Sequence, residues 1–222
     1  MGATTSVLTV FGAEKVIFIR EIGAGYYRLE PYFLSKVLVE IPLGMIAPIV
    51  LITTNYFLSK LQQTATAFFI LMLISILLSN AAIALGILVT SLFQNLQAAL
   101  AAVPILLLPF MLFSGFMITF RSIPAYFSWL QWFSPLKYAF TAMVKNEFTK
   151  PDGISYYDVP DCPYAAKDPR RSYCYGEDAI KSLTMEDQLN IAGNIYVLLG
   201  FFVAYVILAY FSLYRIAPKN LL

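Results

Sequence analysis

Charged side chains of both signs gather just before and inside the first long apolar run of the sequence. Lys36 and Glu40 stand four residues apart, so they share one face of a helix and can form an ion pair. A carboxylate inside a bilayer is costly unless a cation lies beside it. The spacing therefore predicts an intramembrane ion pair near the membrane boundary, which we favour over a relay or gating contact.

The side chains that most enzymes use for acid–base or metal chemistry are scarce. The 222 residues include no histidine and two cysteines, and no apolar run holds a pair of acidic residues. These counts argue against a histidine general base and against a zinc site. The net charge of +2 gives no reason to expect nucleic acid as a partner. We predict no catalytic residue, no metal site and no cofactor bound by this chain. An intramembrane enzyme is the weakest of the functions considered.

The composition predicts an integral membrane protein with an all-α fold, a polytopic helical bundle. Hydrophobic residues make up 59% of the chain and charged residues 13%, and a membrane-spanning helix needs about 20 apolar residues. Residues 1–11 are too few for a span and predict the end of a preceding transmembrane helix. The predicted spans cover residues 37–57, 65–90 and 96–118, which lie within 37–118, and residues 194–214.

Cations near the ends of these spans orient the chain in the membrane. Segment 12–36 and tail 215–222 carry most of the cations that flank the spans. Short cytoplasmic segments hold an excess of Lys and Arg, so we predict that both segments are cytoplasmic. Segment 119–191, a predicted re-entrant segment and loop, is then extracellular. The orienting cations are Lys15, Arg20, Arg28, Lys36, Arg215 and Lys219.

The predicted extracellular loop holds both cysteines, Cys162 and Cys174. Outside the cytosol such a pair oxidises, and the chain-entropy model gives a loop of this size about 3 kcal/mol of stabilisation. We predict a disulfide, with two unrelated thiols as the alternative. Residues 121–148 are rich in Tyr, Trp and Phe, which prefer the headgroup region. This run predicts one or two short helices at the outer leaflet, and an anchoring role and a functional role both stay open.

Three stretches carry a resemblance that runs, in order, along nearly the whole chain. They are EKVIFIREIGAGYYRLEPYFLSKVLVEIP, FMLFSGFMITFRSIPAYFSWLQWFSPLKYAFTAMVKNEF and the stretch that ends in CYGEDAIKSLTM. They resemble the G subfamily of ABC transporters, the White and breast cancer resistance protein-like half-transporters. The first is similar to the entry to the family's third membrane helix, the second to its fifth helix and re-entrant segment, and the third to its outer loop. The resemblance implies an ABC-2 type transmembrane domain, truncated so that it starts within the second helix.

This resemblance implies that segment 12–36 contains the coupling helix, which touches the ATP-binding domain on the cytoplasmic side. Gly23 and Gly25 let the backbone turn there, and Arg28 is suited to pair with a carboxylate of a partner. A simple juxtamembrane loop is the alternative. The predicted coupling residues are Glu14, Lys15, Arg20, Glu21, Gly25, Tyr26, Tyr27 and Arg28.

The resemblance also implies that the predicted span 96–118 lines the substrate path. Pro104, Leu108, Met111 and Gly115 recur at helical spacing, and Met and Phe side chains repack around flat hydrophobic or amphipathic molecules. Lipid-facing or helix-packing surface is the alternative. The predicted path residues are Leu108 and Met111 in the cavity and Phe116 and Met117 in an apolar plug.

The family also implies partners for this chain. The sequence has no Gly-rich phosphate loop of the Walker kind, so ATP and Mg²⁺ would be bound by a nucleotide-binding domain outside it. A second half-transporter would complete a homodimer or heterodimer, and membrane lipid and a hydrophobic small molecule are the other expected partners. We predict the membrane part of an ATP-driven exporter of lipids, sterols or xenobiotics in the plasma membrane. A fragment, a truncated gene model and a split transporter stay open, and a non-transporting scaffold or receptor is the alternative function.

Overall fold

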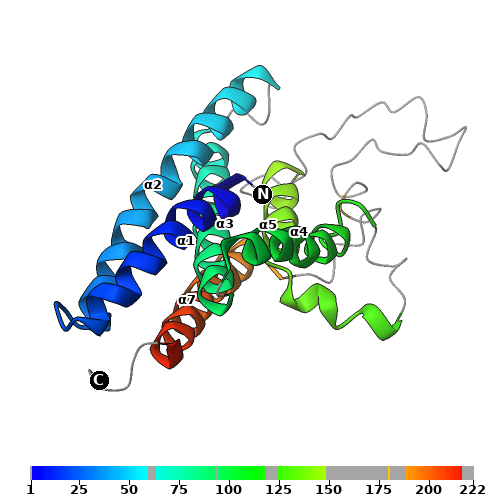
Figure 1. Cartoon of the computed structure of the whole chain (residues 1–222). Coiled ribbons are helices and arrows are strands. Elements are labelled where there is room, and N and C mark those ends of the chain that lie inside the picture. Colours follow the sequence, from blue (N-terminus) through cyan, green and yellow to red (C-terminus); the bar gives the residue numbers. More distant parts are fainter. Residues whose placement is uncertain are drawn as a thin grey trace, which may run out of the picture. The chain divides into compact units, whose positions relative to one another are not determined.

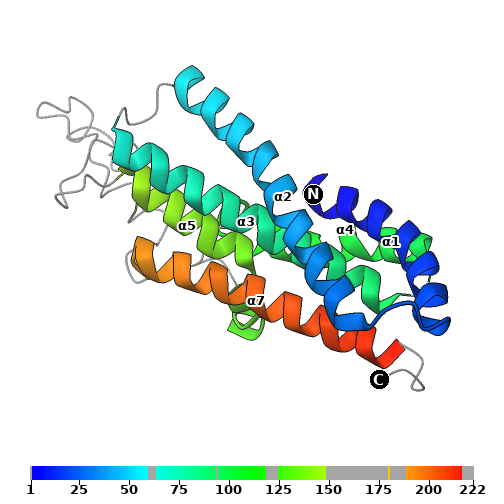
Figure 2. The same cartoon turned by 90° about the vertical axis from the view of Figure 1, so that its left-hand side faces the viewer.

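A computed structural model describes residues 2–59, 64–93, 95–118, 125–148, 180 and 189–216, and every element among them is helical. The prediction of an all-α fold is therefore confirmed for this part of the chain, which Figures 1 and 2 show from two sides. The α-helices are α1 (Gly2–Gly23), α2 (Leu29–Leu58), α3 (Ala65–Leu92), α4 (Leu96–Leu112), α5 (Pro135–Phe148) and α7 (Ile191–Ile216). Two 3-10 helices, η2 (Ala125–Phe127) and η3 (Leu130–Phe133), precede α5.

The chain forms two compact units, and α2, α3, α4 and α7 each contribute residues to both. The first unit contains Met1–Val50, Ile76–Pro109 and Leu198–Leu222. The second contains Leu51–Ser75 and Phe110–Val197. Helix α1 belongs wholly to the first unit and α5 wholly to the second, so each unit has a packing of its own.

Three of the described helices are long and apolar enough to cross a membrane, namely α2, α3 and residues Ile191–Arg215 of α7. Helix α4 has only 17 residues, so the prediction of a helical span over 96–118 is wrong beyond Leu112. The backbone leaves the helix there because Gly115 adopts a φ of 88°, which a right-handed helix excludes. The hydroxyl of Ser114 donates to the carbonyl of Met111 at 2.7 Å and so satisfies one of the last acceptors of the helix.

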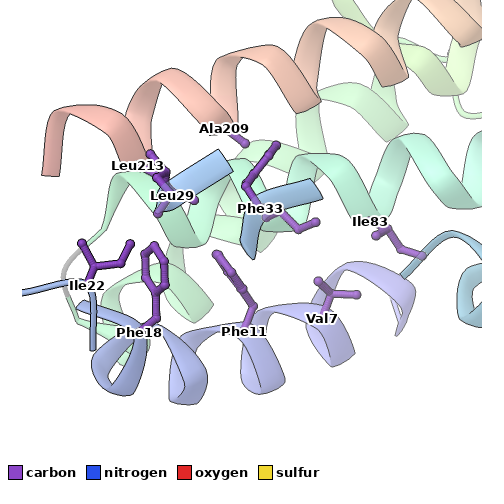
Figure 3. Packing of buried hydrophobic residues seen from close by; sticks show 10 residues of the cluster. Val7, Phe11, Phe18, Ile22, Leu29, Phe33, Ile83, Ala209 and Leu213 are labelled. Carbon is purple, nitrogen blue, oxygen red and sulfur yellow. The ribbon is translucent and has the colours of Figure 1, made fainter. Parts of the chain in front are cut away.

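Buried side chains from four helices form the core of the first unit. Figure 3 shows Phe11, Phe18 and Ile22 of α1 on the side of that helix that faces α2 and α7. Apolar burial of this kind supplies the main favourable term in packing these segments. The buried members of the cluster are Val7, Phe11, Phe18, Ile22, Leu29, Phe33, Ile83, Ile87, Ala209 and Leu213.

The contact between α2 and α3 in the first unit depends on a proline and a glycine. Pro48 has no N–H, so it cannot donate to the carbonyl of Gly44 as an ordinary residue would. The hydroxyl of Ser79 donates to that carbonyl instead, at 2.9 Å. A side chain on Gly44 would overlap Ile83, because an ideal Cβ there would collide with the Ile83 Cδ1 atom. The missing side chain thus lets the two helices approach closely enough for the hydroxyl to reach.

In the second unit, polar side chains tie α5 and the segment before it to the ends of other helices. The amide of Asn146 donates to the carbonyl of Ala67 in the first turn of α3, at 2.9 Å. The hydroxyl of Ser134 donates to the carbonyl of Phe110 near the end of α4, at 2.9 Å. The run 121–148 was predicted to form one or two short helices and contains three, η2, η3 and α5, and their place at the outer leaflet stays a prediction.

Candidate functional site

The α1–α2 turn, which we define as Gly23–Arg28, reverses the chain between the first two helices. Its backbone closes the end of α1, where the N–H of Ala24 donates to the carbonyl of Arg20 at 3.0 Å and the N–H of Gly25 to that of Ile22 at 2.9 Å. Gly25 has a φ of 79°, a conformation that other residues adopt only with strain. The sequence requirement for glycine at this position is therefore conformational, as the predicted turn demands.

Aromatic rings brace the turn from within. Tyr27 lies near parallel to Tyr32 with 5.8 Å between ring centroids, and Tyr32 stacks on Phe18 at 4.1 Å. The hydroxyl of Tyr27 donates to a carboxylate oxygen of Glu21 at 2.6 Å. Burial and this hydrogen bond raise the pKa of Tyr27 to about 12, so the phenol keeps its proton at physiological pH. The stack and the hydrogen bond hold the end of α1 and the start of α2 in one fixed arrangement.

The outer side of the turn is exposed and carries cations. Arg20, Tyr26 and Arg28 are all exposed, and 79% of the surface of Tyr26 is accessible. A guanidinium presents several donors in a rigid fork that matches a carboxylate. Six of the eight predicted coupling residues thus fall into two groups. Glu21, Gly25 and Tyr27 shape the turn, and Arg20, Tyr26 and Arg28 are exposed on its surface.

The predicted pair Lys36–Glu40 is present within a larger ion-pair network. The Lys36 ammonium lies 3.1 Å from a carboxylate oxygen of Glu40 and 2.7 Å from one of Glu14. It also lies 5.9 Å from the ring centroid of Phe11. Glu14 therefore links α1 to α2 by charge, a role that the sequence did not indicate. A role of the pair in gating stays untested.

Lys15 lies away from the exposed side of the turn. It is only 5% exposed, and its ammonium donates to the carbonyls of Thr90, Ser91 and Phe93 at 2.9, 3.1 and 2.9 Å. The sequence did not indicate these partners, since main-chain acceptors leave no residue pattern. One signal was present: the last turn of α3 contains no basic residue, and a cation at the carbonyl end of a helix is favourable.

The residues predicted to line a substrate path are separated by the end of α4. Leu108 belongs to the first unit and is 52% exposed, whereas Met111, Phe116 and Met117 belong to the second. Phe116 and Met117 follow the helix and are exposed, and the Phe116 ring lies edge-on to Phe140 with 5.6 Å between centroids. The predicted helical face therefore ends at Met111 and does not include Gly115.

Two further predictions concern metal and sulfur chemistry. Within the described ranges, no three His, Cys, Asp or Glu side chains lie close enough together to hold a metal ion. Cys162 and Cys174 lie outside the described residues, so the disulfide stays a prediction.

The comparisons with known proteins agree on one family. The profile of the family described as ABC-2 type transporter matches residues 1–148. The ABC transporter ATP-binding protein/permease wht-1 of Caenorhabditis elegans is 38% identical over 153 residues, which is 69% of this chain and 22% of that protein. ABC transporter G family member 8 of Arabidopsis thaliana is 32% identical over 220 residues, 97% of this chain and 36% of that protein.

A third relative is the broad substrate specificity ATP-binding cassette transporter ABCG2 of Mus musculus. It is 32% identical over 160 residues, which is 72% of this chain and 24% of the mouse protein. The chain thus spans between about a fifth and about a third of the length of these relatives. The G-subfamily resemblance drawn from the GYYR-containing and NEF-containing stretches is confirmed by these matches.

Proposed function

Because the chain belongs to the ABC-2 type transporter family, we propose that it is the membrane-spanning part of an ATP-driven exporter. A nucleotide-binding domain outside this chain would bind ATP and Mg²⁺ and press on the α1–α2 turn. A second half-transporter, identical or different, would complete the translocation path in the plasma membrane. The chain itself would catalyse no reaction.

The observation that carries the proposal is the construction of the α1–α2 turn. A flexible loop would absorb a push from a partner domain, whereas a turn fixed by Gly25, the Tyr27–Glu21 hydrogen bond and the ring stack passes it on. Arg20 and Arg28 leave donors on the outer surface for acidic groups of the partner. The turn therefore has a fixed backbone and exposed hydrogen-bond donors, a combination that suits a contact that transmits force.

We further propose hydrophobic or amphipathic molecules as substrates, such as lipids, sterols or xenobiotics. The exposed apolar side chains of Leu108, Phe116 and Met117 support this class, since they offer contact area without fixed hydrogen-bonding demands. The name of the mouse relative, with its broad substrate specificity, supports a range of substrates over a single one.

Uptake of a hydrophobic fluorescent dye into inside-out membrane vesicles tests the proposal. The vesicles hold the assembled transporter, meaning this chain together with its nucleotide-binding domain. Replacing Arg20 and Glu21 together with alanine should lower ATP-dependent uptake by about fivefold or more, because coupling between sites is worth on the order of 1–2 kcal/mol. Arg215→Ala is the matched control, since Arg215 is an exposed arginine at the end of α7, outside the turn.

Two results would contradict the proposal. Equal uptake by the double variant and the unsubstituted protein would remove the coupling role of the turn. If the unsubstituted protein shows no ATP-dependent uptake of any hydrophobic dye, the non-transporting scaffold or receptor becomes the better account.

A further inference from the structure

A buried lysine joins α1 to the junction of α3 and α4, which we call the α3–α4 corner and define as residues 90–93, 95 and 96. The last carbonyls of a helix lack partners within it and carry partial negative charge. Lys15 reaches across from α1, and its one ammonium donates to three carbonyls at this junction, those of Thr90, Ser91 and Phe93, within 3.1 Å. Hydrogen bonds from a charged donor are stronger than neutral ones, the more so where water is excluded.

The second contact at the corner is steric and lies one helical turn earlier on α1. Gly12 faces Leu96, the first residue of α4, so closely that an ideal Cβ on Gly12 would lie 2.5 Å from the Leu96 Cδ1 atom. Leu96 therefore occupies the space that a larger residue at position 12 would fill. Gly12 thus contacts the start of α4 through close packing, and Lys15 contacts the end of α3 through its charge.

These contacts connect the two regions that the proposed exporter needs to link. Along α1, Lys15 is followed by Phe18 and Ile22, which are buried in the core of the first unit, and then by the α1–α2 turn. Along the chain, the corner leads directly into α4 and to Leu108. Helix α1 thus connects the α1–α2 turn with the α3–α4 corner through Lys15. Helix α4 connects that corner with Leu108 of the predicted substrate path.

We propose that Lys15 is a positioning residue that fixes the α3–α4 corner to α1, so that corner and turn move as one body. A displacement of the α1–α2 turn would then reach α4 by two routes. One runs through α2, and the other runs back along α1 to the Lys15 contact with the α3–α4 corner. This inference rests on the proposed function, because it assumes that the turn is pushed. It predicts that the contacts of Gly12 and Lys15 with the corner, which we call the α1–corner joint, stay closed throughout the transport cycle.

A disulfide across the joint tests this prediction directly. An ideal Cβ on Gly12 lies 3.7 Å from the Cβ of Leu96, which falls within the range of Cβ separations in disulfides. The variant Gly12→Cys with Leu96→Cys should therefore cross-link under mild oxidation in the assembled transporter. Dye uptake by the oxidised and the reduced forms should agree within about twofold, since a joint that never opens loses nothing when it is locked. The single variants Gly12→Cys and Leu96→Cys under the same oxidant are the controls.

The role of the charge is tested in the same assay. Lys15→Met keeps the apolar stem but removes the ammonium, and it should lower ATP-dependent uptake per folded protein by about fivefold while basal ATP hydrolysis per folded protein stays unchanged. Lys15→Arg should retain uptake, and the 12–96 disulfide should restore it to Lys15→Met, because the covalent bond replaces the lost connection. A merely structural lysine would lower uptake and hydrolysis together and would not be rescued.

Three outcomes overturn the inference. They are a cysteine pair that does not cross-link, a cross-linked form that stops transporting and recovers on reduction, and a Lys15→Met variant with normal uptake. Failure of the proposed function is distinguishable from all three, because the unsubstituted transporter would then show no ATP-dependent uptake at all while the cross-link would still form.

Discussion

The carbonyl of Gly44 offers a quantitative test of how a proline-containing helix is kept intact in an apolar environment. Pro48 cannot supply the usual donor, and the Ser79 hydroxyl replaces it at 2.9 Å. Ser79→Ala would leave this carbonyl without a partner, and an unsatisfied buried group costs about 1–3 kcal/mol. Hydrogen bonds between membrane helices measure on average about 0.6 and at most about 1.7 kcal/mol. We expect Ser79→Ala to lower the free energy of unfolding by about 1.5 kcal/mol, between these limits.

A double-mutant cycle isolates the contribution of the proline. Pro48→Ala restores an N–H that can donate to the Gly44 carbonyl within α2, so the hydroxyl of Ser79 becomes dispensable. In that background Ser79→Ala should cost less than about 0.5 kcal/mol, which gives a coupling energy of about 1 kcal/mol between the two positions. The assay is reversible unfolding of the purified protein in mixed micelles, titrated with a denaturing detergent and followed by circular dichroism.

Ser75→Ala serves as the matched control for the loss of a hydroxyl. Ser75 also donates to a carbonyl, that of Leu71, but within its own helix, where the N–H of Ser75 already serves as the helical donor. Its removal should cost less than about 0.5 kcal/mol, since no carbonyl loses its only partner. If Ser79→Ala costs the same with Pro48 as in the Pro48→Ala background, or no more than Ser75→Ala, the explanation by the freed carbonyl is wrong.

Three further tests probe packing and charge, each read as a change in unfolding free energy in the same assay. Gly86→Ala should cost about 1–3 kcal/mol, because the added Cβ would lie 3.0 Å from the carbonyl oxygen of Thr4. Gly200→Ala, which meets no atom within 4 Å, should be neutral or stabilising by up to about 1 kcal/mol, and the reverse order would refute the packing argument. Asn146→Leu should cost about 1–2 kcal/mol through the buried bond from α5 to α3, and a neutral result would show that this bond is replaceable. Lys36→Met leaves two carboxylates without their cation and should cost about 3 kcal/mol or more. Lys36→Arg should recover most of this stability. Equal losses in the two variants would mean that packing and not charge determines the contribution of Lys36.

The sequence predicted the helices well where a single physical requirement decides their extent. Apolar runs long enough for a bilayer placed α2, α3 and α7 within a few residues at their C-terminal ends, because leaving the hydrocarbon and ending the run coincide there. The end of α4 was placed too late, since the apolar run continues to Ile118 while the backbone turns at Gly115. Hydropathy reports what a bilayer tolerates and contains no information about a positive φ.

The charged residues were harder to place, because their partners lie far away along the chain. Glu14 and Lys15 were both predicted to be coupling residues on the basis of the family resemblance. In the structure, Glu14 forms an ion pair with Lys36 on α2. Lys15 donates hydrogen bonds to main-chain oxygens more than 70 residues later in the sequence. An ion pair at a spacing of four residues, such as Lys36–Glu40, is visible in a sequence. A cation on a carbonyl end is not, except through the missing basic residue in the last turn of α3.

Within the first unit, two departures from regular helix geometry are each served by a polar atom of a different helix. Ser79 of α3 supplies the donor that Pro48 removes from α2, and Lys15 of α1 supplies the cation that the end of α3 lacks. Water could do both in a soluble protein, but Pro48 lies within the predicted span 37–57, where no water is available, and Lys15 is only 5% exposed. Each such bond fixes one helix to one point of another, unlike the apolar contacts of the core, which allow small shifts. One of these points lies beside Pro48 of α2 and the other at the α3–α4 corner. A few polar contacts therefore fix the positions of α1, α2 and α3 along one another, while the large apolar surface supplies cohesion.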